Sequence, residues 1–231
     1  MIPLKDTIRS YSFPFVNWLL IAANVVVFLF ESSLSQGQLN RLFFAYGLVP
    51  VSFDATDPAS ILTIFTSMFL HGGWLHLINN LWALYIFGDN VEDRMGSVRY
   101  LVFYLLCGAI AGLAQLLINS DQSVPGIGAS GAIAGVLAAY LVLFPRARVI
   151  TLVLLFFFLT FTEIPALLYL GVWFVIQLFS GLMTLGTPSN IGGIAYWAHI
   201  GGFLAGLLLV FPFARRQRAY YRWYPDEYRP W

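Results

Sequence analysis

The stretch GIGASGAIAG, from Gly126 to Gly135, combines small residues with the start of an apolar run. Gly131 and Gly135 have the GxxxG spacing that lets two membrane helices approach closely. The same spacing recurs in AHIGGFLAG, residues 198–206, which predicts two helices that pack backbone against backbone. Ser130 stands at the start of the first run, where it is either one more packing residue or a nucleophile.

The composition indicates a membrane protein. Of the 231 residues, 59% are hydrophobic and 10% are charged, against roughly 25% charged residues in soluble domains. Several apolar runs approach the length needed to cross a bilayer, which predicts an all-α, multi-pass protein surrounded by lipid. The net charge of +1 argues against a nucleic acid as partner. The single cysteine, Cys107, excludes an internal disulfide and a cysteine-based metal cluster.

We expect a six-transmembrane-helix bundle. The six predicted spans are Phe15–Phe30, Trp74–Phe87, Tyr100–Ile118, Ala129–Phe144, Ala166–Leu182 and Tyr196–Phe213. They divide the chain into a cytoplasmic N-terminal segment (1–14), a membrane domain (15–213) and a cytoplasmic tail (214–231). The long first loop, Glu31–Gly73, mixes apolar and polar residues and is expected to lie on or in the outer leaflet.

Positive charge decides between six spans and seven. A further apolar stretch, Val149–Phe161, is short, rich in phenylalanine and β-branched residues, and soon followed by Pro165. With six spans, all of the 12 basic residues except Arg41 lie on the inner side, as the positive-inside rule requires. Val149–Phe161 is therefore expected to lie along the membrane without crossing it. A layout of six spans without added domains is typical of a bacterial inner-membrane protein, and we expect both termini to be cytoplasmic.

Three polar side chains meet on one side of the membrane in this topology. Ser130, His76 and His199 all lie near the outer ends of their predicted spans. Serine beside glycine is commonly a packing residue in membrane helices, but an ionisable residue within a span is costly and usually functional. The GxxxG faces bring Ser130 within hydrogen-bond reach of His199, which predicts a nucleophile and its general base.

The second predicted span supplies candidate donors for an oxyanion. His76 and Asn80 are four residues apart and share one helix face. With the backbone N–H of Ser130 they can converge on one oxygen atom. An interhelical hydrogen bond is the alternative role for Asn80, while Asn79, off this face, is assigned to structure.

Other catalytic chemistries find no support in the sequence. The histidines lack HExxH spacing, and His71 and His76, five apart, diverge on a helix, so neither a metal nor a cofactor is expected. None of the 11 acidic residues falls within a predicted span. This excludes a paired-aspartate intramembrane protease and leaves no obvious carboxylate for a catalytic triad. The charged loop block Glu92–Arg94, on the inner side, is expected to stabilise the fold.

Four blocks of the sequence together resemble the rhomboid family of intramembrane serine proteases. In chain order they are HGGWLHLINN (71–80), FGDNVEDRMGS (87–97), GIGASGAIAG (126–135) and YWAHIGGFLAG (196–206). The resemblance covers nearly the whole membrane core, with helix order and spacing to match. It implies a rhomboid-like six-helix fold.

The resemblance also implies roles for individual residues. Ser130 is then the nucleophile and His199 the general base. His76 and Asn80 donate to the oxyanion, with support from Gly128. The implied reaction is cleavage of single-span transmembrane proteins near the outer side of the membrane. The alternative is a proteolytically inactive rhomboid-like protein that binds membrane clients, whereas a small transporter is disfavoured because the polar groups lie at helix ends rather than at the midplane.

Two features of the sequence depart from the family pattern. Leu62 and Thr63 stand where many members have a Trp-Arg pair in the first loop. Ala134 stands where many members carry an aromatic residue that stacks on the catalytic histidine. His71 matches a loop histidine that helps shape the mouth of the cavity in the family.

Overall fold

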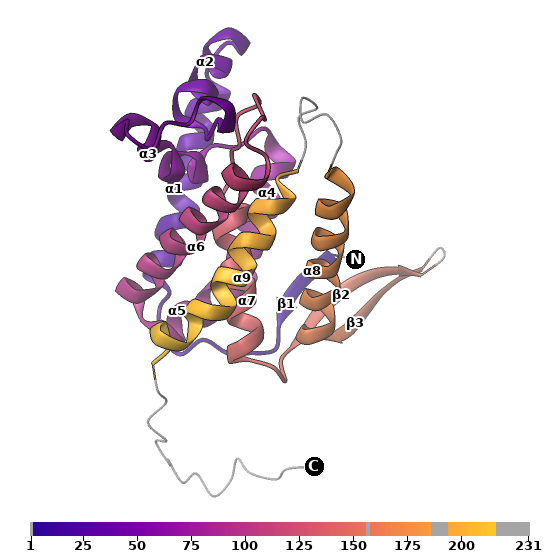
Figure 1. Cartoon of the computed structure of the whole chain (residues 1–231). Helices are drawn as coiled ribbons and strands as arrows, with labels where there is room; N and C mark the ends of the chain where they lie inside the picture. Colours follow the sequence, from indigo (N-terminus) through magenta and orange to yellow (C-terminus); the bar gives the residue numbers. More distant parts are fainter. Residues whose placement is uncertain (1, 156–157, 186–193, 216–231) are drawn as a thin grey trace, which may run out of the picture.

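Helices make up most of the structure, with a small sheet at one side (Figure 1). This computed structural model describes residues 2–155, 158–185 and 194–215, so most of the expected tail lies outside the described residues. The helical elements are α1 (Phe15–Ser32), α2 (Gln36–Tyr46), η1 (Pro50–Ser52), α3 (Pro58–Thr66), η2 (Ser67–Phe69), α4 (Trp74–Ala83), the π-helical turn η3 (Leu84–Gly88), α5 (Asp89–Met95), α6 (Ser97–Ile118), α7 (Ser130–Leu143), α8 (Ala166–Thr184) and α9 (Tyr196–Phe213). The strands are β1 (Ile2–Asp6), β2 (Arg148–Leu155) and β3 (Phe158–Pro165).

Several helices are long and apolar enough to cross a membrane. Among the described residues these are α1, α6, α8 and α9, and a bent pair makes a fifth candidate if it counts as one span. The pair joins Pro58–Phe69 to Trp74–Met95 at an angle of 82°. α7 is apolar but has only 14 residues, fewer than the roughly 20 that a full crossing takes. The predicted multi-pass helical class is therefore confirmed at the level of four or five candidate spans.

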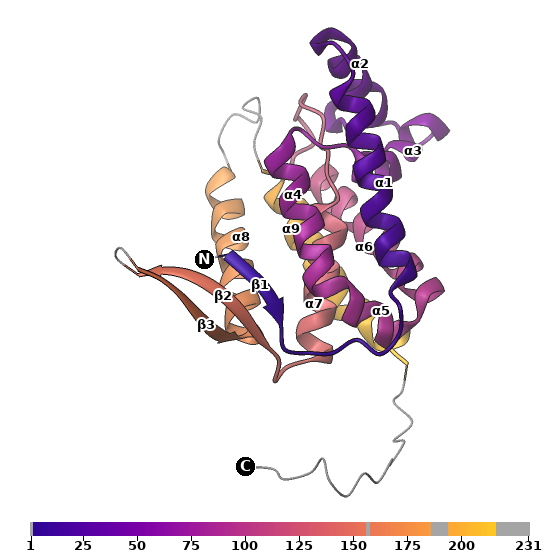
Figure 2. The ribbon, with the colours of Figure 1, turned by 180° about the vertical axis from the view of Figure 1, so that it is seen from behind.

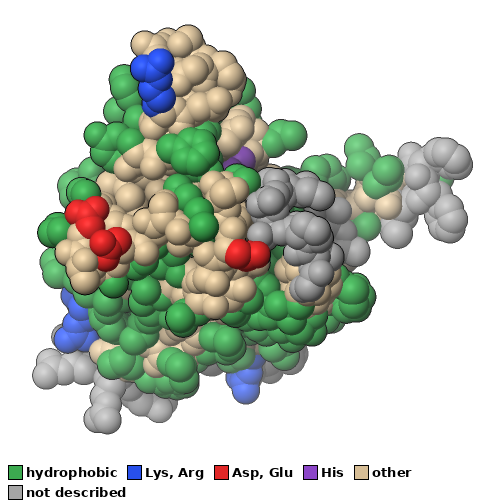
Figure 3. Space-filling model, turned by 45° about the horizontal axis from the view of Figure 1, so that its top comes forward, with side chains coloured by type: hydrophobic (Ala, Val, Ile, Leu, Met, Phe, Trp, Pro, Cys, Tyr) green, Lys and Arg blue, Asp and Glu red, His purple; other side chains and the backbone are tan. Residues whose placement is uncertain are grey.

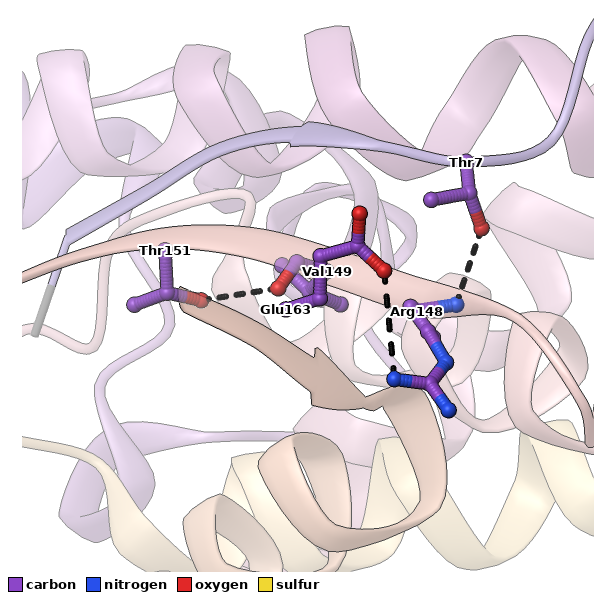
Figure 4. A network of polar contacts seen from close by, with 5 residues as sticks. All are labelled: Thr7, Arg148, Val149, Thr151 and Glu163. Carbon is purple, nitrogen blue, oxygen red and sulfur yellow. Dashed lines mark hydrogen bonds and ion pairs between the residues drawn. The ribbon is translucent and has the colours of Figure 1, made fainter. Parts of the chain in front are cut away.

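The expectation of an all-α protein is wrong for two segments. β2 and β3 form an antiparallel hairpin over the stretch expected to lie along the membrane, and β1 pairs with β2 to give the order β1-β2-β3. The stretches RVITLVLL and FLTFTEIP are rich in β-branched and aromatic residues, which pack well on a pleated surface. At the base of the hairpin, the backbone N–H of Arg148 donates to the hydroxyl oxygen of Thr7 (3.0 Å), and its guanidinium lies 3.8 Å from the carboxylate of Glu163 (Figure 4).

α7 lies at the centre of the bundle, and every residue from Gly131 to Tyr140 is buried. It contacts α6 and α9 most extensively, and also α4, α5 and α8 (Figures 1 and 2). Its far end is tied to the sheet, because the hydroxyl of Tyr140 donates to the carboxylate of Asp6 on β1 at 2.6 Å. Burial raises the pKa of Asp6 above its usual value.

Glycines let α7 and α9 approach at backbone distance. A Cβ added to Gly202 would collide with the carbonyl oxygen of Gly131, and one added to Gly206 would collide with the carbonyl oxygen of Gly135. On the side facing α6, a Cβ on Gly135 would lie 2.5 Å from the sulfur of Cys107. We call this contact between α7 and α9 the glycine seam. It realises the GxxxG packing that the sequence predicts.

Glu92 holds the N-terminus of α1. Its buried carboxylate accepts hydrogen bonds from the backbone N–H groups of Val16 (3.0 Å) and Asn17 (2.7 Å) and from the hydroxyl of Ser97 (2.6 Å). The first turn of a helix leaves such N–H groups without an intrahelical partner, and a carboxylate there also complements the helix dipole. The expected stabilising role of this charged block is confirmed, although the block is helical, in α5, rather than a loop.

Glu92→Gln should lower the free energy of unfolding by about 2 kcal/mol, because it removes the charge that strengthens these buried hydrogen bonds. Thermal unfolding of the purified protein in detergent measures this loss. Glu163→Gln is the matched control: its carboxylate is exposed and makes one weak ion pair, so it should cost less than about 1 kcal/mol. Equal losses in the two variants would contradict the capping role.

Gly202→Ala should push α7 and α9 apart and cost roughly 2 kcal/mol or more of stability, as overpacking does in a close-packed interior. Gly171→Ala, on α8, has nothing within 4 Å of the added Cβ, and alanine favours helix over glycine. The control should therefore be neutral or slightly stabilised in the same unfolding experiment. A Gly202→Ala protein as stable as Gly171→Ala would mean that the glycine seam is not closely packed.

Candidate active site

The glycine seam brings a serine and a histidine together at one end of the bundle. Ser130 is the first residue of α7, and His199 lies in the first turn of α9. The hydroxyl oxygen of Ser130 lies 2.7 Å from Nε2 of His199, which is hydrogen-bond distance. His199 is buried and Ser130 is half-buried. The pair has the geometry of a nucleophile and its base.

The second ring nitrogen of His199 also has a partner. Nδ1 lies 2.7 Å from Oε1 of Gln177 on α8. The ring of Trp173, one helical turn earlier, lies 5.9 Å from the imidazole at an interplanar angle of 36°. Sequence reasoning missed both residues. The available signal was an amide side chain within the apolar run ALLYLGVWFVIQLFSGLMT, one turn after a tryptophan.

The loop before α7 is pressed against α4. Gly128 has a φ of +124°, a conformation that side chains disfavour. A Cβ there would lie 2.6 Å from Nε2 of His76 and 3.8 Å from Nδ2 of Asn80. The N–H of Gly128 donates to the carbonyl of Ser67 at 2.8 Å, which holds the loop in place. The structure therefore brings together His76 and Asn80, which the sequence predicts as oxyanion donors, and Gly128, which it predicts to support them.

Among the described residues, two side-chain donors at this point are available to a ligand. Nδ2 of Asn80 is buried and has no hydrogen-bond partner among the described residues, which is uncommon in native proteins. Nδ1 of His76 accepts a long hydrogen bond, 3.4 Å, from the N–H of Gly72, so the ring proton is assigned to Nε2, on the side of Gly128. Asn79, by contrast, is exposed.

His71 lies behind His76 rather than in the site. Their rings are 5.0 Å apart, edge to face. The N–H of His71 donates to the carboxylate of Glu31 at the end of α1, at 3.2 and 3.3 Å, and its Nδ1 lies 3.3 Å from the carbonyl of Phe69. The buried His71 thus fixes the loop that leads into α4.

A cleft of about 840 Å³ lies over these groups. Its walls include His76 and Asn80 from α4, Ser130 from α7, and Trp173 and Gln177 from α8. In the view onto the end that carries α2, a histidine side chain (purple) reaches the surface among hydrophobic ones (Figure 3). A mostly apolar cleft with a few convergent polar groups is the usual form of a binding site. In the described part of the chain, no cluster of His, Cys, Asp or Glu is arranged to hold a metal ion.

Several curated relatives are named as organellar proteins. The chain is 32% identical over 158 residues to Rhomboid protein 1, mitochondrial, of Saccharomyces cerevisiae, covering 64% of this chain and 41% of the relative. It is 28% identical over 198 residues to the human Presenilin-associated rhomboid-like protein, mitochondrial, covering 83% and 46%. It is 41% identical over 73 residues to Rhomboid-like protein 11, chloroplastic, of Arabidopsis thaliana, covering 32% and 26%. The chain thus spans less than half the length of each of these relatives.

These relatives overturn the expected location. A bacterial inner membrane with cytoplasmic termini was the wrong expectation, because the proteins above are mitochondrial or chloroplastic proteins of yeast, human and plant. The physical reason for the error is that the distribution of Lys and Arg reports which side of a membrane a loop lies on. It carries no information about which membrane that is.

A family model described as the Rhomboid domain matches residues 58–216. This range is more than half of the chain, and it begins with α3 and runs through α9. It contains the serine, the histidines, the asparagine and the glycine described above. The chain therefore belongs to the rhomboid family.

Proposed function

We propose that this protein is an intramembrane serine endopeptidase that uses a Ser–His dyad. The observation that carries the proposal is the 2.7 Å contact between the Ser130 hydroxyl and Nε2 of His199. Family membership supports it, and so does the cleft that both residues line. Nδ2 of Asn80, which has no hydrogen-bond partner among the described residues, lines the same cleft and is a suitable donor to an oxyanion.

The proposed reaction follows from these positions. Nε2 of His199 takes the proton of the Ser130 hydroxyl as its oxygen attacks the peptide carbonyl carbon. The oxyanion accepts hydrogen bonds from Nδ2 of Asn80, from Nε2 of His76 and from the N–H of Ser130. His199 then gives its proton to the leaving amine as the C–N bond breaks. Water, deprotonated by His199, hydrolyses the acyl-enzyme and frees Ser130.

We propose further that six helical segments span the membrane: α1, α4 with α5, α6, α7, α8 and α9. The short α7 is enclosed by its neighbours, so it need not reach both surfaces itself. The segment 2–14 and the C-terminal end of α9 then lie on one side, and the segment between α1 and α4 lies at the opposite leaflet. The substrates are single-span transmembrane proteins, and the named relatives favour a mitochondrial membrane.

Ser130→Ala and His199→Ala should each abolish cleavage of single-span substrates by the protein in lipid vesicles, since each removes one half of the dyad. Their thermal unfolding should stay close to that of the wild type. Ser52→Ala, whose hydroxyl makes only a 3.5 Å contact to the carbonyl of Val49, is the control and should cleave normally. A wild-type protein that binds these substrates without cleaving them would instead favour the inactive, client-binding alternative.

Asn80→Ala should lower the turnover rate by about 10²–10³-fold with little change in apparent substrate affinity, because an oxyanion donor acts on the transition state. Stability should hardly change, since Nδ2 of Asn80 makes no hydrogen bond among the described residues. Asn79→Ala is the comparison, one residue and roughly 100° around the helix, and should cost far less. A larger loss from Asn79→Ala at equal stability would assign the oxyanion to backbone donors near Gly128.

A further inference from the structure

A histidine acts as a general base only in one of its two neutral forms. To accept the proton of Ser130 at Nε2, His199 must carry its own proton on Nδ1. The group hydrogen-bonded to Nδ1 therefore decides whether the ring is poised as a base. Serine proteases of other folds use a buried carboxylate for this purpose. In this protein both ring nitrogens have identified partners, and the partner of Nδ1 is an amide.

Gln177 is held where it meets His199 from the side. The buried residues of α8 are Ala166, Leu170, Gln177 and Gly181, whose spacing places them on one helix face. Gln177 is only 8% exposed, and Oε1 lies 2.7 Å from Nδ1 of His199. Trp173, one turn away, adds an aromatic ring beside the imidazole. One face of α8 thus contacts both the Nδ1 edge and the ring of His199.

Only one orientation of this amide is compatible with a base. With Oε1 toward the ring, the amide accepts a hydrogen bond from Nδ1–H, and Nε2 keeps its lone pair for Ser130. The same oxygen still accepts from Nδ1–H after Nε2 has taken the serine proton, so the contact survives through the reaction. With the NH₂ group toward the ring, the proton would sit on Nε2 and block it.

We propose that Gln177 is a positioning residue that fixes the base-competent form of His199, with Trp173 limiting the tilt of the ring. This inference rests on the proposed function, since it assigns a partner to the same dyad. The alternative is that Gln177 merely joins α8 to α9 by an interhelical hydrogen bond. The two roles predict different effects of a carboxylate at position 177. A negative charge there changes the protonation of His199, whereas it has little effect on a hydrogen bond that only joins the two helices.

The test measures the reactivity of Ser130 without a protein substrate. A fluorophosphonate reacts with the serine oxygen: the O–P bond forms, the P–F bond breaks with loss of fluoride, and the serine proton passes to Nε2 of His199. Labelling rates are measured from pH 5 to 9 for the wild type, Gln177→Leu, Gln177→Glu and Ser130→Ala. Leu170→Met, seven residues away on the same buried face of α8, is the matched control, and thermal unfolding monitors the fold of every variant.

We expect Gln177→Leu to label about 10-fold more slowly, as expected for losing a hydrogen bond that orients a reacting group. Gln177→Glu should keep a rate near that of the wild type at high pH. The acid limb of its pH profile should move to higher pH by about one unit, because a carboxylate at Nδ1 favours the protonated ring. His76, which lines the same cleft as His199, is unchanged in all variants. Leu170→Met should match the wild type.

Two results would overturn the inference while leaving the dyad in place. One is a Gln177→Leu protein that labels as fast as the wild type. The other is a Gln177→Glu protein that is as slow as Gln177→Leu, with an unmoved acid limb, which would assign Gln177 to packing. A wild-type protein that labels no faster than Ser130→Ala would overturn the dyad itself, and with it any partner of its base.

Discussion

The backbone contact between α7 and α9 is the constraint on which the rest of the structure depends. In lipid, close van der Waals packing rather than hydrophobic burial holds helices together, and Gly131, Gly135, Gly202 and Gly206 provide it. Because α7 and α9 begin at the same end of the bundle, their contact sets both the height and the rotation of their first turns. The hydrogen bond of 2.7 Å between Ser130 and His199 would be lost after a displacement much smaller than the width of a methyl group. The same glycines therefore determine both the packing of the two helices and the distance between Ser130 and His199.

Polar groups away from this contact fall into two kinds. Glu92 caps α1, Glu31 accepts from the N–H of His71, and Ser67 accepts from Gly128; each of these bonds fixes a helix end or a loop. Within a bilayer, backbone N–H groups cannot hydrogen-bond to water, so hydrogen bonds of this kind are required there. The Nδ2 atom of Asn80 has no such partner in the described part of the chain. Violations of the local rules tend to gather at functional sites, and this one lies in the cleft that Ser130 also lines.

The sequence was most informative where a residue type or a spacing is compatible with a single structural interpretation. Ser130, His199, His76 and Asn80 could be grouped from topology alone, because charge sidedness and helix spacing place them at one end of the bundle. The sheet could not be foreseen in the same way, since an apolar run rich in valine, leucine and phenylalanine fits a strand and a membrane-surface helix alike. β1 depends on a pairing partner about 145 residues away in the chain. Gln177 was missed because an amide has no charge to mark it, and its meaning depends on which way α8 is rotated.

The open sheet has a consequence for how deep the site lies in the bilayer. The outer edge of β3 leaves N–H and C=O groups unpaired by any other strand of this sheet, and hydrocarbon does not satisfy them. In the proposed topology the base of the hairpin, where Arg148 and Glu163 are both about half exposed, is therefore expected at a membrane–water boundary. α8 starts at Ala166, directly after it, and Gln177 is eleven residues further on, or roughly 16 Å at 1.5 Å per residue. In a hydrocarbon layer about 30 Å thick, that depth lies past the midplane, toward the end of the bundle at which α7 and α9 begin. The thickness of the membrane then determines which peptide bond of a substrate helix lies at the depth of Ser130. In a thinner bilayer, a different bond of the same substrate would lie at that depth.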